Sequence, residues 1–210
     1  MLKPFYSLGS VSLAAVLAAS LLLAGCKEAP DGAADKADKV VAAVPVSTAV
    51  IAAEAKGFIA GSQMSQRTVY VFFDAQCPHC AALWVAAKPL KSQAKFVWIP
   101  VGILNAASTS QGASLLAASD PVAAMDEHEA SMQARRGGIS AAGNIDAQKD
   151  AVEKNTALMT RLGFTSIPTI VGTHAQTGAL VTQEGASSTA ALANLLGLQV
   201  PADLPAAPAK

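Results

Sequence analysis

Two cysteines separated by two residues form the part of the sequence best suited to chemistry, in the order Cys77-Pro78-His79-Cys80. A β-branched and aromatic run precedes Cys77, and helix-favouring residues follow it, so we expect Cys77 at the start of a helix. The unpaired N–H groups and partial positive charge at a helix N-terminus stabilise a thiolate and lower its pKa. Two intervening residues bring Cys80 within reach of Cys77 on the first turn. The motif therefore predicts a redox-active pair whose disulfide can form and reopen.

The two residues between the cysteines fit this interpretation. Pro78 suits the first helical turn, because the N–H that proline lacks has no intrahelical partner there. His79, when charged or donating a hydrogen bond, favours the Cys77 thiolate and makes the pair a stronger oxidant. A structural disulfide is an alternative, although a loop this short adds little stability. Half of a zinc site is another, but it needs two further ligands; we interpret His128 as an exposed helix residue and His174 as a turn residue, and expect no metal.

The third cysteine, Cys26, follows the apolar run Val11–Leu23 near the N-terminus. The segment Leu23-Ala24-Gly25-Cys26 resembles the lipobox of bacterial lipoproteins, in which the cysteine is lipidated. This resemblance implies that residues 1–25 are a signal peptide and that Cys26 anchors the protein to a membrane. The alternative is an uncleaved apolar anchor. Because Lys27, and not aspartate, follows the cysteine, we expect a periplasmic protein at the outer membrane.

Composition and charge limit the remaining possibilities. The chain has 210 residues, of which 52% are hydrophobic, and 15 basic residues balance 15 acidic ones. This length suits one globular domain, and the net charge of zero argues against binding to nucleic acid. Residues 26–50 are rich in Ala, Asp and Lys and predict a flexible tether. We place the domain at 51–198 and a loose Pro/Ala-rich tail at 199–210.

The periodicity of apolar residues predicts an α/β domain. Strands are expected at 68–73 and 96–101 with a helix at 78–90 between them, which is a βαβ unit with a parallel strand pair. Helical segments follow, and two more strands and a last helix complete the domain. We expect them at 112–119, 120–135 and 146–162 (helices), 169–172 and 179–182 (strands) and 188–196 (helix).

Four separated segments resemble the thioredoxin superfamily, and the periplasmic DsbC/DsbG disulfide isomerases in particular. Val69–Cys80 is similar to the strand and active-site turn of that family, and the other three match in order and spacing: Trp98–Ile103, Ser114–Pro121 and Thr165–Thr169. The resemblance implies a thioredoxin-like fold, with a central mixed sheet built from βαβ and ββα units. It also implies a helical insertion at about 105–162 between the two halves.

The resemblance also assigns roles. It implies that Cys77 is the nucleophile, that Cys80 is the resolving thiol, and that Ile167-Pro168 is a cis peptide that holds the substrate backbone; an ordinary trans proline is the alternative. No cofactor is expected beyond the redox-active Cys77–Cys80 disulfide. The function implied is reduction or isomerisation of disulfides in client proteins by a membrane-tethered periplasmic oxidoreductase, with a membrane redox partner.

Three features depart from that family. The tether leaves no room for an N-terminal dimerisation domain, so we do not expect dimerisation. The dipeptide Pro78-His79 is the one found in the oxidase DsbA, which keeps a dithiol oxidase open as an alternative function. Val71 occupies the position of a buried acid in thioredoxin and DsbA, so Cys80 must pass its proton to His79, water or substrate. A chaperone or copper-handling module that uses the two thiols as ligands is a further alternative.

Overall fold

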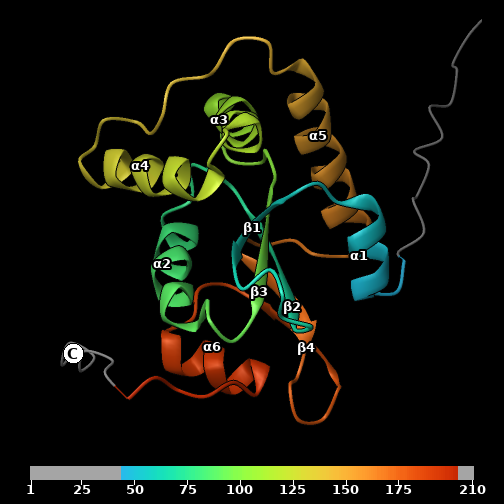
Figure 1. Ribbon diagram of the computed structural model, residues 1–210. Helices are drawn as coiled ribbons and strands as arrows, with labels where there is room; N and C mark the ends of the chain where they lie inside the picture. The colour runs from blue at the N-terminus through green and yellow to red at the C-terminus, as the bar shows by residue number, and fades with distance from the viewer. Residues whose placement is uncertain (1–43, 203–210) are drawn as a thin grey trace, which may run out of the picture. The chain divides into compact units, whose positions relative to one another are not determined.

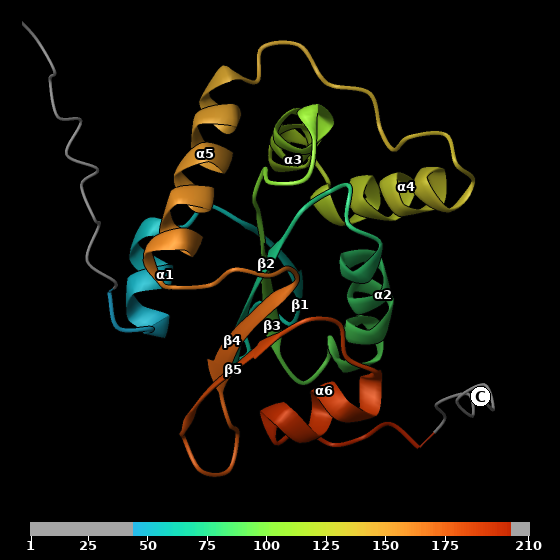
Figure 2. The same cartoon turned by 180° about the vertical axis from the view of Figure 1, so that it is seen from behind.

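The computed structural model describes residues 44–202, which contain a five-stranded mixed sheet (Figures 1 and 2). The strands lie in the order β1-β3-β2-β4-β5. Their bounds are β1 Phe58–Gly61, β2 Thr68–Phe73, β3 Lys95–Pro100, β4 Thr169–Thr173 and β5 Leu180–Glu184. β2 and β3 are parallel and all other neighbours are antiparallel. The expected βαβ unit and the expected α/β domain with a central mixed sheet are thereby confirmed.

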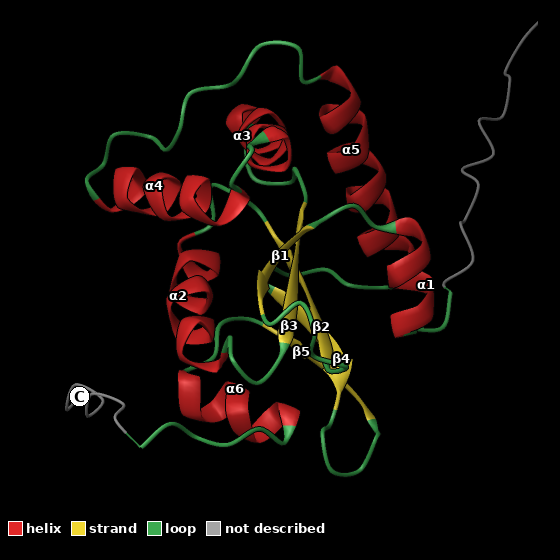
Figure 3. Ribbon diagram, viewed as in Figure 1, coloured by secondary structure: helices red, strands yellow, loops and turns green. Residues whose placement is uncertain are grey.

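Six α-helices surround the sheet in the described part of the chain (Figure 3). They are α1 Thr48–Glu54, α2 Pro78–Ala87, α3 Ala106–Ala117, α4 Pro121–Gln133, α5 Asp146–Arg161 and α6 Thr189–Leu196, and a 3-10 turn, η1 (Lys88–Leu90), follows α2. Helices α3 to α5 lie between β3 and β4 in the sequence, so they form the predicted helical insertion.

The alternation of side chains along β2 explains why both faces of the sheet are covered. Val69, Val71 and Phe73 belong to a core cluster that includes residues of α2 and α6. Tyr70 and Phe72 point to the opposite face and pack in a cluster with residues of α1 and α5. Figure 1 shows α2 and α6 on one side of the sheet and α1 and α5 on the other. A strand buried on both faces has no polar alternation, which is why β2 is a continuous apolar run.

Strand β1 was not predicted and is a correction to the expected element order. No strand was expected before residue 68, but α1 ends at Glu54 and the chain becomes the edge strand β1 at Phe58. β1 pairs antiparallel with β3 through four residue pairs. It has only four residues and ends in Gly61, so it carries too little pattern to be recognised from sequence.

The structured part begins before residue 51, which corrects the boundary expected for the tether. Ile51 is fully buried, and Val46 and Val50 pack against the same cluster. At the other end, Gln199 exchanges two hydrogen bonds with Gln93, so the chain is still fixed at residue 199.

Helix α3 is longer than the segment expected at 112–119. It begins at Ala106 because Asn105 caps it: the Asn105 side chain accepts a hydrogen bond from Ala107 N at 2.8 Å, and Ser108 Oγ accepts one from Asn105 N at 3.1 Å. This reciprocal pairing is a capping box that uses serine at the third helical position.

The expected signal peptide, the lipidated Cys26 and most of the tail lie outside the described residues. Within residues 44–202, no helix has both the length and the apolar character required to span a bilayer.

Candidate active site

The Cys77–Cys80 pair lies where β2 passes into α2. β2 ends at Phe73, and Cys77 is the N-cap residue of α2, with Pro78 in the first turn. The backbone N–H of Cys80 donates a hydrogen bond to Cys77 Sγ at 3.3 Å. Both cysteines are free thiols; Cys77 is 6% exposed and Cys80 is fully buried. The helix N-terminus therefore presents its unpaired donors to Cys77, as the sequence predicted.

The surroundings of Cys77 favour its thiolate. Its pKa is lowered to about 6, chiefly by a hydrogen bond from the Cys80 side chain. Backbone N–H groups of Cys80 and His79 and the charge of His79 lower it further, while burial opposes them. Because a thiolate is the attacking form, Cys77 can act as a nucleophile at neutral pH.

Cys80 is held in the opposite state. Burial is the largest cause that raises the pKa of the Cys80 thiol, and the hydrogen bond to Cys77 and the negative charge of Cys77 raise it further. The pair is therefore asymmetric: one sulfur is poised to attack, and the other stays protonated until the first has reacted.

Asp74 fixes the turn that carries the pair. This carboxylate is almost completely buried and accepts backbone hydrogen bonds from Ile103 at 2.8 Å, Leu104 at 3.0 Å and Gln76 at 2.9 Å. Cys77 N donates to Asp74 O at 3.0 Å. The active-site turn is thus tied to the segment between β3 and α3. Asp74 was not among the predicted site residues, although an acid directly after a buried strand is a visible signal.

His128 is the clearest error of the sequence interpretation. It was expected on an exposed helix face, but its side chain is fully buried. Its Nε2 lies 2.6 Å from Ala75 O, and its Nδ1 accepts a hydrogen bond from Ile139 N at 3.2 Å. The two contacts together require neutral imidazole with the proton on Nε2. His128 therefore holds the active-site turn from α4. His174, by contrast, is a turn residue as predicted; its Nδ1 accepts from Gln176 N and Thr177 N.

The loop before β4 faces the cysteine pair. The Ile167–Pro168 peptide bond is cis, and Cys77 Sγ lies 4.0 Å from Ile167 O. Pro168 is buried and Ile167 is half-buried. The structure therefore brings the predicted residues Cys77, Cys80, Ile167 and Pro168 together, with Pro78 and His79 exposed beside them.

Glu129 of α4 is a further acidic group beside Cys77, and no motif in the sequence singles it out. It is 5% exposed and lines a cavity of about 350 Å³ with Cys77, Pro78 and Met132. Burial and, secondarily, the charge of Cys77 raise its pKa to about 7. Val71 leaves β2 without an acid at this position, but Glu129 of the insertion lines the same cavity as the nucleophile.

We expect Glu129 to take part in the proton balance of the redox reaction. Oxidation of Cys77 removes a negative charge beside Glu129 and so lowers its pKa, and reduction raises it again. At pH values between the pKa of Glu129 in the oxidised protein and its pKa in the reduced protein, reduction of the pair takes up one extra proton. The reduction potential therefore falls more steeply with pH in this range, by as much as about 30 mV per pH unit more. The Glu129→Gln variant should lose this steeper region near pH 7. Glu127→Gln, an exposed neighbour on α4, is the matched control, and an identical curve for wild type and Glu129→Gln would contradict the coupling.

Metal ligands do not gather near the pair. Over residues 44–202, no group of three or more His, Cys, Asp and Glu side chains is arranged to hold a metal ion.

The fold and the placement of the pair define a class of protein. A family model described as a thioredoxin-like domain matches residues 58–199, which is most of the chain. The protein belongs to this family of thioredoxin-like domains.

Within that class, the chain is similar to proteins named for disulfide exchange. It is 32% identical over 140 residues to the thiol:disulfide interchange protein DsbG of Pseudomonas aeruginosa, covering 65% of this chain and 54% of that protein. The chain thus spans about half the length of that relative.

Solved structures share the fold at lower identity. A periplasmic thioredoxin-like protein from Salmonella enterica serovar Typhimurium superimposes with a TM-score of 0.57 at 15% identity, covering 73% of this chain and 97% of that one. Pseudomonas aeruginosa DsbA2 superimposes with a TM-score of 0.55 at 19% identity, covering 67% of this chain and 95% of that one. The catalytic domain of Proteus mirabilis ScsC superimposes with a TM-score of 0.53 at 15% identity, covering 67% of this chain and 87% of that one.

Proposed function

We propose that this protein is a periplasmic thiol–disulfide oxidoreductase that reduces or isomerises disulfides in client proteins. The observation that carries the proposal is the asymmetry of the pair: Cys77 is the N-cap of α2 with a pKa lowered to about 6, and Cys80 is buried with its pKa raised. The similarity to DsbG supports the same class of reaction.

The exchange begins when the Cys77 thiolate attacks one sulfur of a client disulfide. A Cys77–client disulfide forms, and the other client sulfur leaves as a thiolate. In the reductive branch, Cys80 loses its proton and attacks Cys77 Sγ, which releases the second client thiolate and leaves a Cys77–Cys80 disulfide. The client has then gained the two electrons that the pair has lost. In the isomerising branch, another client thiolate attacks the mixed disulfide instead, and Cys77 returns as a thiolate with no net change in electrons.

The loop that contains Ile167 and Pro168 holds the client. This loop lies against Cys77, and the resemblance to the family implies that it binds the substrate backbone. Cysteine-containing proteins are the clients in this proposal. A membrane-bound thiol reductant returns the oxidised pair to the dithiol form, and a lipid at Cys26 tethers the domain to a membrane.

Net oxidation is a second candidate, and a specific observation favours it. Stabilising the thiolate of the nucleophile stabilises the reduced form of the pair, which makes its disulfide a stronger oxidant. The lowered pKa of Cys77, to which His79 contributes, acts in this direction.

The redox state of the pair in cells distinguishes the two directions. Acid quenching followed by alkylation with a thiol reagent of known mass should show Cys77 and Cys80 largely reduced in growing cells. A resting pair that is fully oxidised would reject the reductase or isomerase and favour the oxidase. Wild-type protein that is fully reduced with a dithiol before alkylation provides the reference for the doubly alkylated state.

A further inference from the structure

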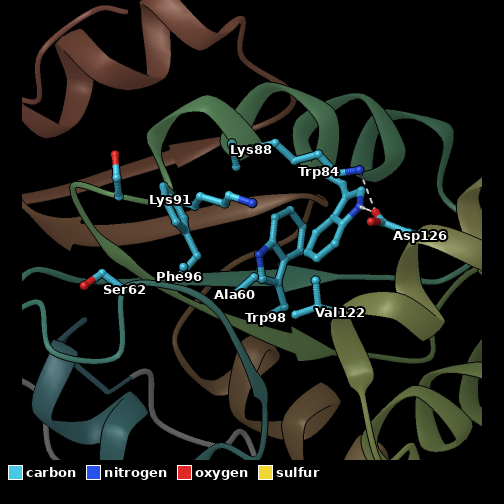
Figure 4. A pocket seen from close by; sticks show the side chains of 12 residues that line it. Ala60, Ser62, Trp84, Lys88, Lys91, Phe96, Trp98, Val122 and Asp126 are labelled. Carbon is cyan, nitrogen blue, oxygen red and sulfur yellow. Dashed lines mark hydrogen bonds and ion pairs between the residues drawn. The ribbon is translucent and has the colours of Figure 1, made fainter.

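A second cavity lies away from the cysteine pair, between the C-terminal part of α2, the edge strand β1 and the start of α4 (Figure 4). Its volume is about 730 Å³, which is in the range of small-molecule sites. Three aromatic side chains form much of its wall: Trp84, Phe96 and Trp98. The exchange reaction uses none of these residues.

One hydrogen-bond donor in this cavity has no acceptor. Nε1 of Trp98 is the only buried side-chain nitrogen or oxygen between residues 44 and 202 without a hydrogen-bond partner. Trp98 is fully buried, and Figure 4 shows its indole ring beside Lys91 among the side chains that line the cavity. A buried donor without a partner is rare in proteins, because it loses its hydrogen bond to water and gains none in return.

The neighbouring tryptophan shows what the missing partner should be. Trp84 Nε1 donates to the carboxylate of Asp126 at 2.6 Å, and Lys88 forms an ion pair with the same carboxylate at 2.6 Å. Asp126 is therefore already shared between an indole N–H and an ammonium group. Trp98 and Lys91 supply the same two donor types to the cavity, but no carboxylate accompanies them.

The charges point in the same direction. The cavity is lined by Lys88, Lys91 and Asp126, which leaves one uncompensated positive charge. Lys91 forms no ion pair among the described residues. Its side chain is exposed and reaches across the cavity in Figure 4, so it can move to admit a ligand.

We propose that this cavity binds a small organic acid with a flat apolar body. The carboxylate accepts a hydrogen bond from Trp98 Nε1 and pairs with the ammonium group of Lys91. The flat body lies against the aromatic wall formed by Trp84, Phe96 and Trp98. One negative charge on the ligand neutralises the site.

The two indole N–H groups make the proposal directly measurable. The chain contains two tryptophans, and both line this cavity, so a ¹⁵N–¹H correlation spectrum of the full chain holds two indole signals, assignable with a Trp98→Phe variant. Titration with 2-naphthoate should move the Trp98 Nε1–H signal downfield in a saturable way and should move the Trp84 signal less. The neutral 2-naphthamide should bind at least about tenfold more weakly, as expected for loss of a charge-assisted hydrogen bond.

Variants separate this site from general binding and from the redox pair. Lys91→Met keeps the length of an exposed side chain and should weaken 2-naphthoate binding about tenfold. Lys149→Met, on α5 and outside the cavity, is the matched control and should bind as wild type does. Cys77→Ser should also bind normally, because the site does not depend on the pair.

Three results would overturn the proposal. An unchanged Trp98 Nε1–H signal on titration with 2-naphthoate would show that the carboxylate does not accept a hydrogen bond from this group, whether or not naphthoate binds elsewhere. Equal affinities for 2-naphthoate and 2-naphthamide would show that no group in the cavity recognises the carboxylate. If Lys91→Met and Lys149→Met weakened the binding of 2-naphthoate equally, the loss of affinity would reflect only the net charge of the protein.

Discussion

We expect the Cys77→Ser variant to lose disulfide exchange completely and the Cys80→Ala variant to stall as a mixed disulfide with its clients. Serine cannot provide the thiolate that Cys77 forms with a pKa of about 6, so no client sulfur is attacked. In Cys80→Ala the attack still occurs, but the buried sulfur that would release the client is absent. Turnover of a scrambled disulfide-bonded substrate should fall to the uncatalysed background in Cys77→Ser. Non-reducing electrophoresis of Cys80→Ala should show client-linked species that a reductant removes.

The third cysteine is the control for these variants. Cys26→Ser should exchange disulfides in solution as the wild type does, because we infer from the lipobox resemblance that Cys26 takes no part in thiol chemistry. It should, however, lack the mass of the attached lipid when the protein is isolated from cells. Failure of Cys80→Ala to trap any client, with Cys77→Ser still active, would contradict the assignment of Cys77 as the nucleophile.

Much of the fold was predictable because its elements carry strong local signals. Strand β2 is a continuous apolar run because it is buried on both faces of the sheet. Helix α4 begins at Pro121, where the Asp120 side chain caps the helix and the proline ring suits its first turn. The edge strand β1 was not predictable in this way. Its existence depends on pairing with β3, a contact that no periodicity within four residues encodes.

The same distinction applies to the site. Cys77 and Cys80 are neighbours in sequence, so their spacing and the helix start could be inferred directly. His128 and Glu129 reach the active-site turn only because the insertion folds α4 against it. On α4 they are flanked by polar residues that suggest an exposed face, and only tertiary packing reveals that they are buried.

His128 should make a large contribution to stability although it is a polar residue. Its imidazole joins Ala75 O on the active-site turn to Ile139 N after α4. The His128→Ala variant leaves the buried Ala75 O without a partner, removes the acceptor of the part-buried Ile139 N–H and creates a cavity, so the free energy of unfolding should fall by about 2–4 kcal/mol. Urea denaturation at pH 7.5 measures this loss.

Two glycines next to this contact provide a matched test of the packing. Gly137 and Gly138 both have positive φ, so alanine strains the backbone at either position. A Cβ at Gly138 would lie 2.4 Å from His128 Cε1, whereas a Cβ at Gly137 would meet nothing within 4 Å. Gly138→Ala should therefore destabilise the protein clearly more than Gly137→Ala. Equal losses would mean that His128 can move aside without consequence.

The pH dependence gives His128 a signature that a merely space-filling residue lacks. Burial lowers its pKa below the ordinary 6.5, and a second ring proton would face the N–H of Ile139. At pH values between the lowered pKa of folded His128 and 6.5, the unfolded chain binds more protons than the folded chain. The stabilising contribution of His128 is therefore full above pH 6.5 and declines as the pH falls below 6.5.

Glu129, whose pKa is raised to about 7, has the opposite effect, because its folded form binds more protons than its unfolded form. The difference between wild type and His128→Gln removes the Glu129 contribution and isolates the histidine. Wild type should lose stability relative to His128→Gln as the pH falls below 6.5, and parallel curves would show that His128 does not remain neutral in the fold.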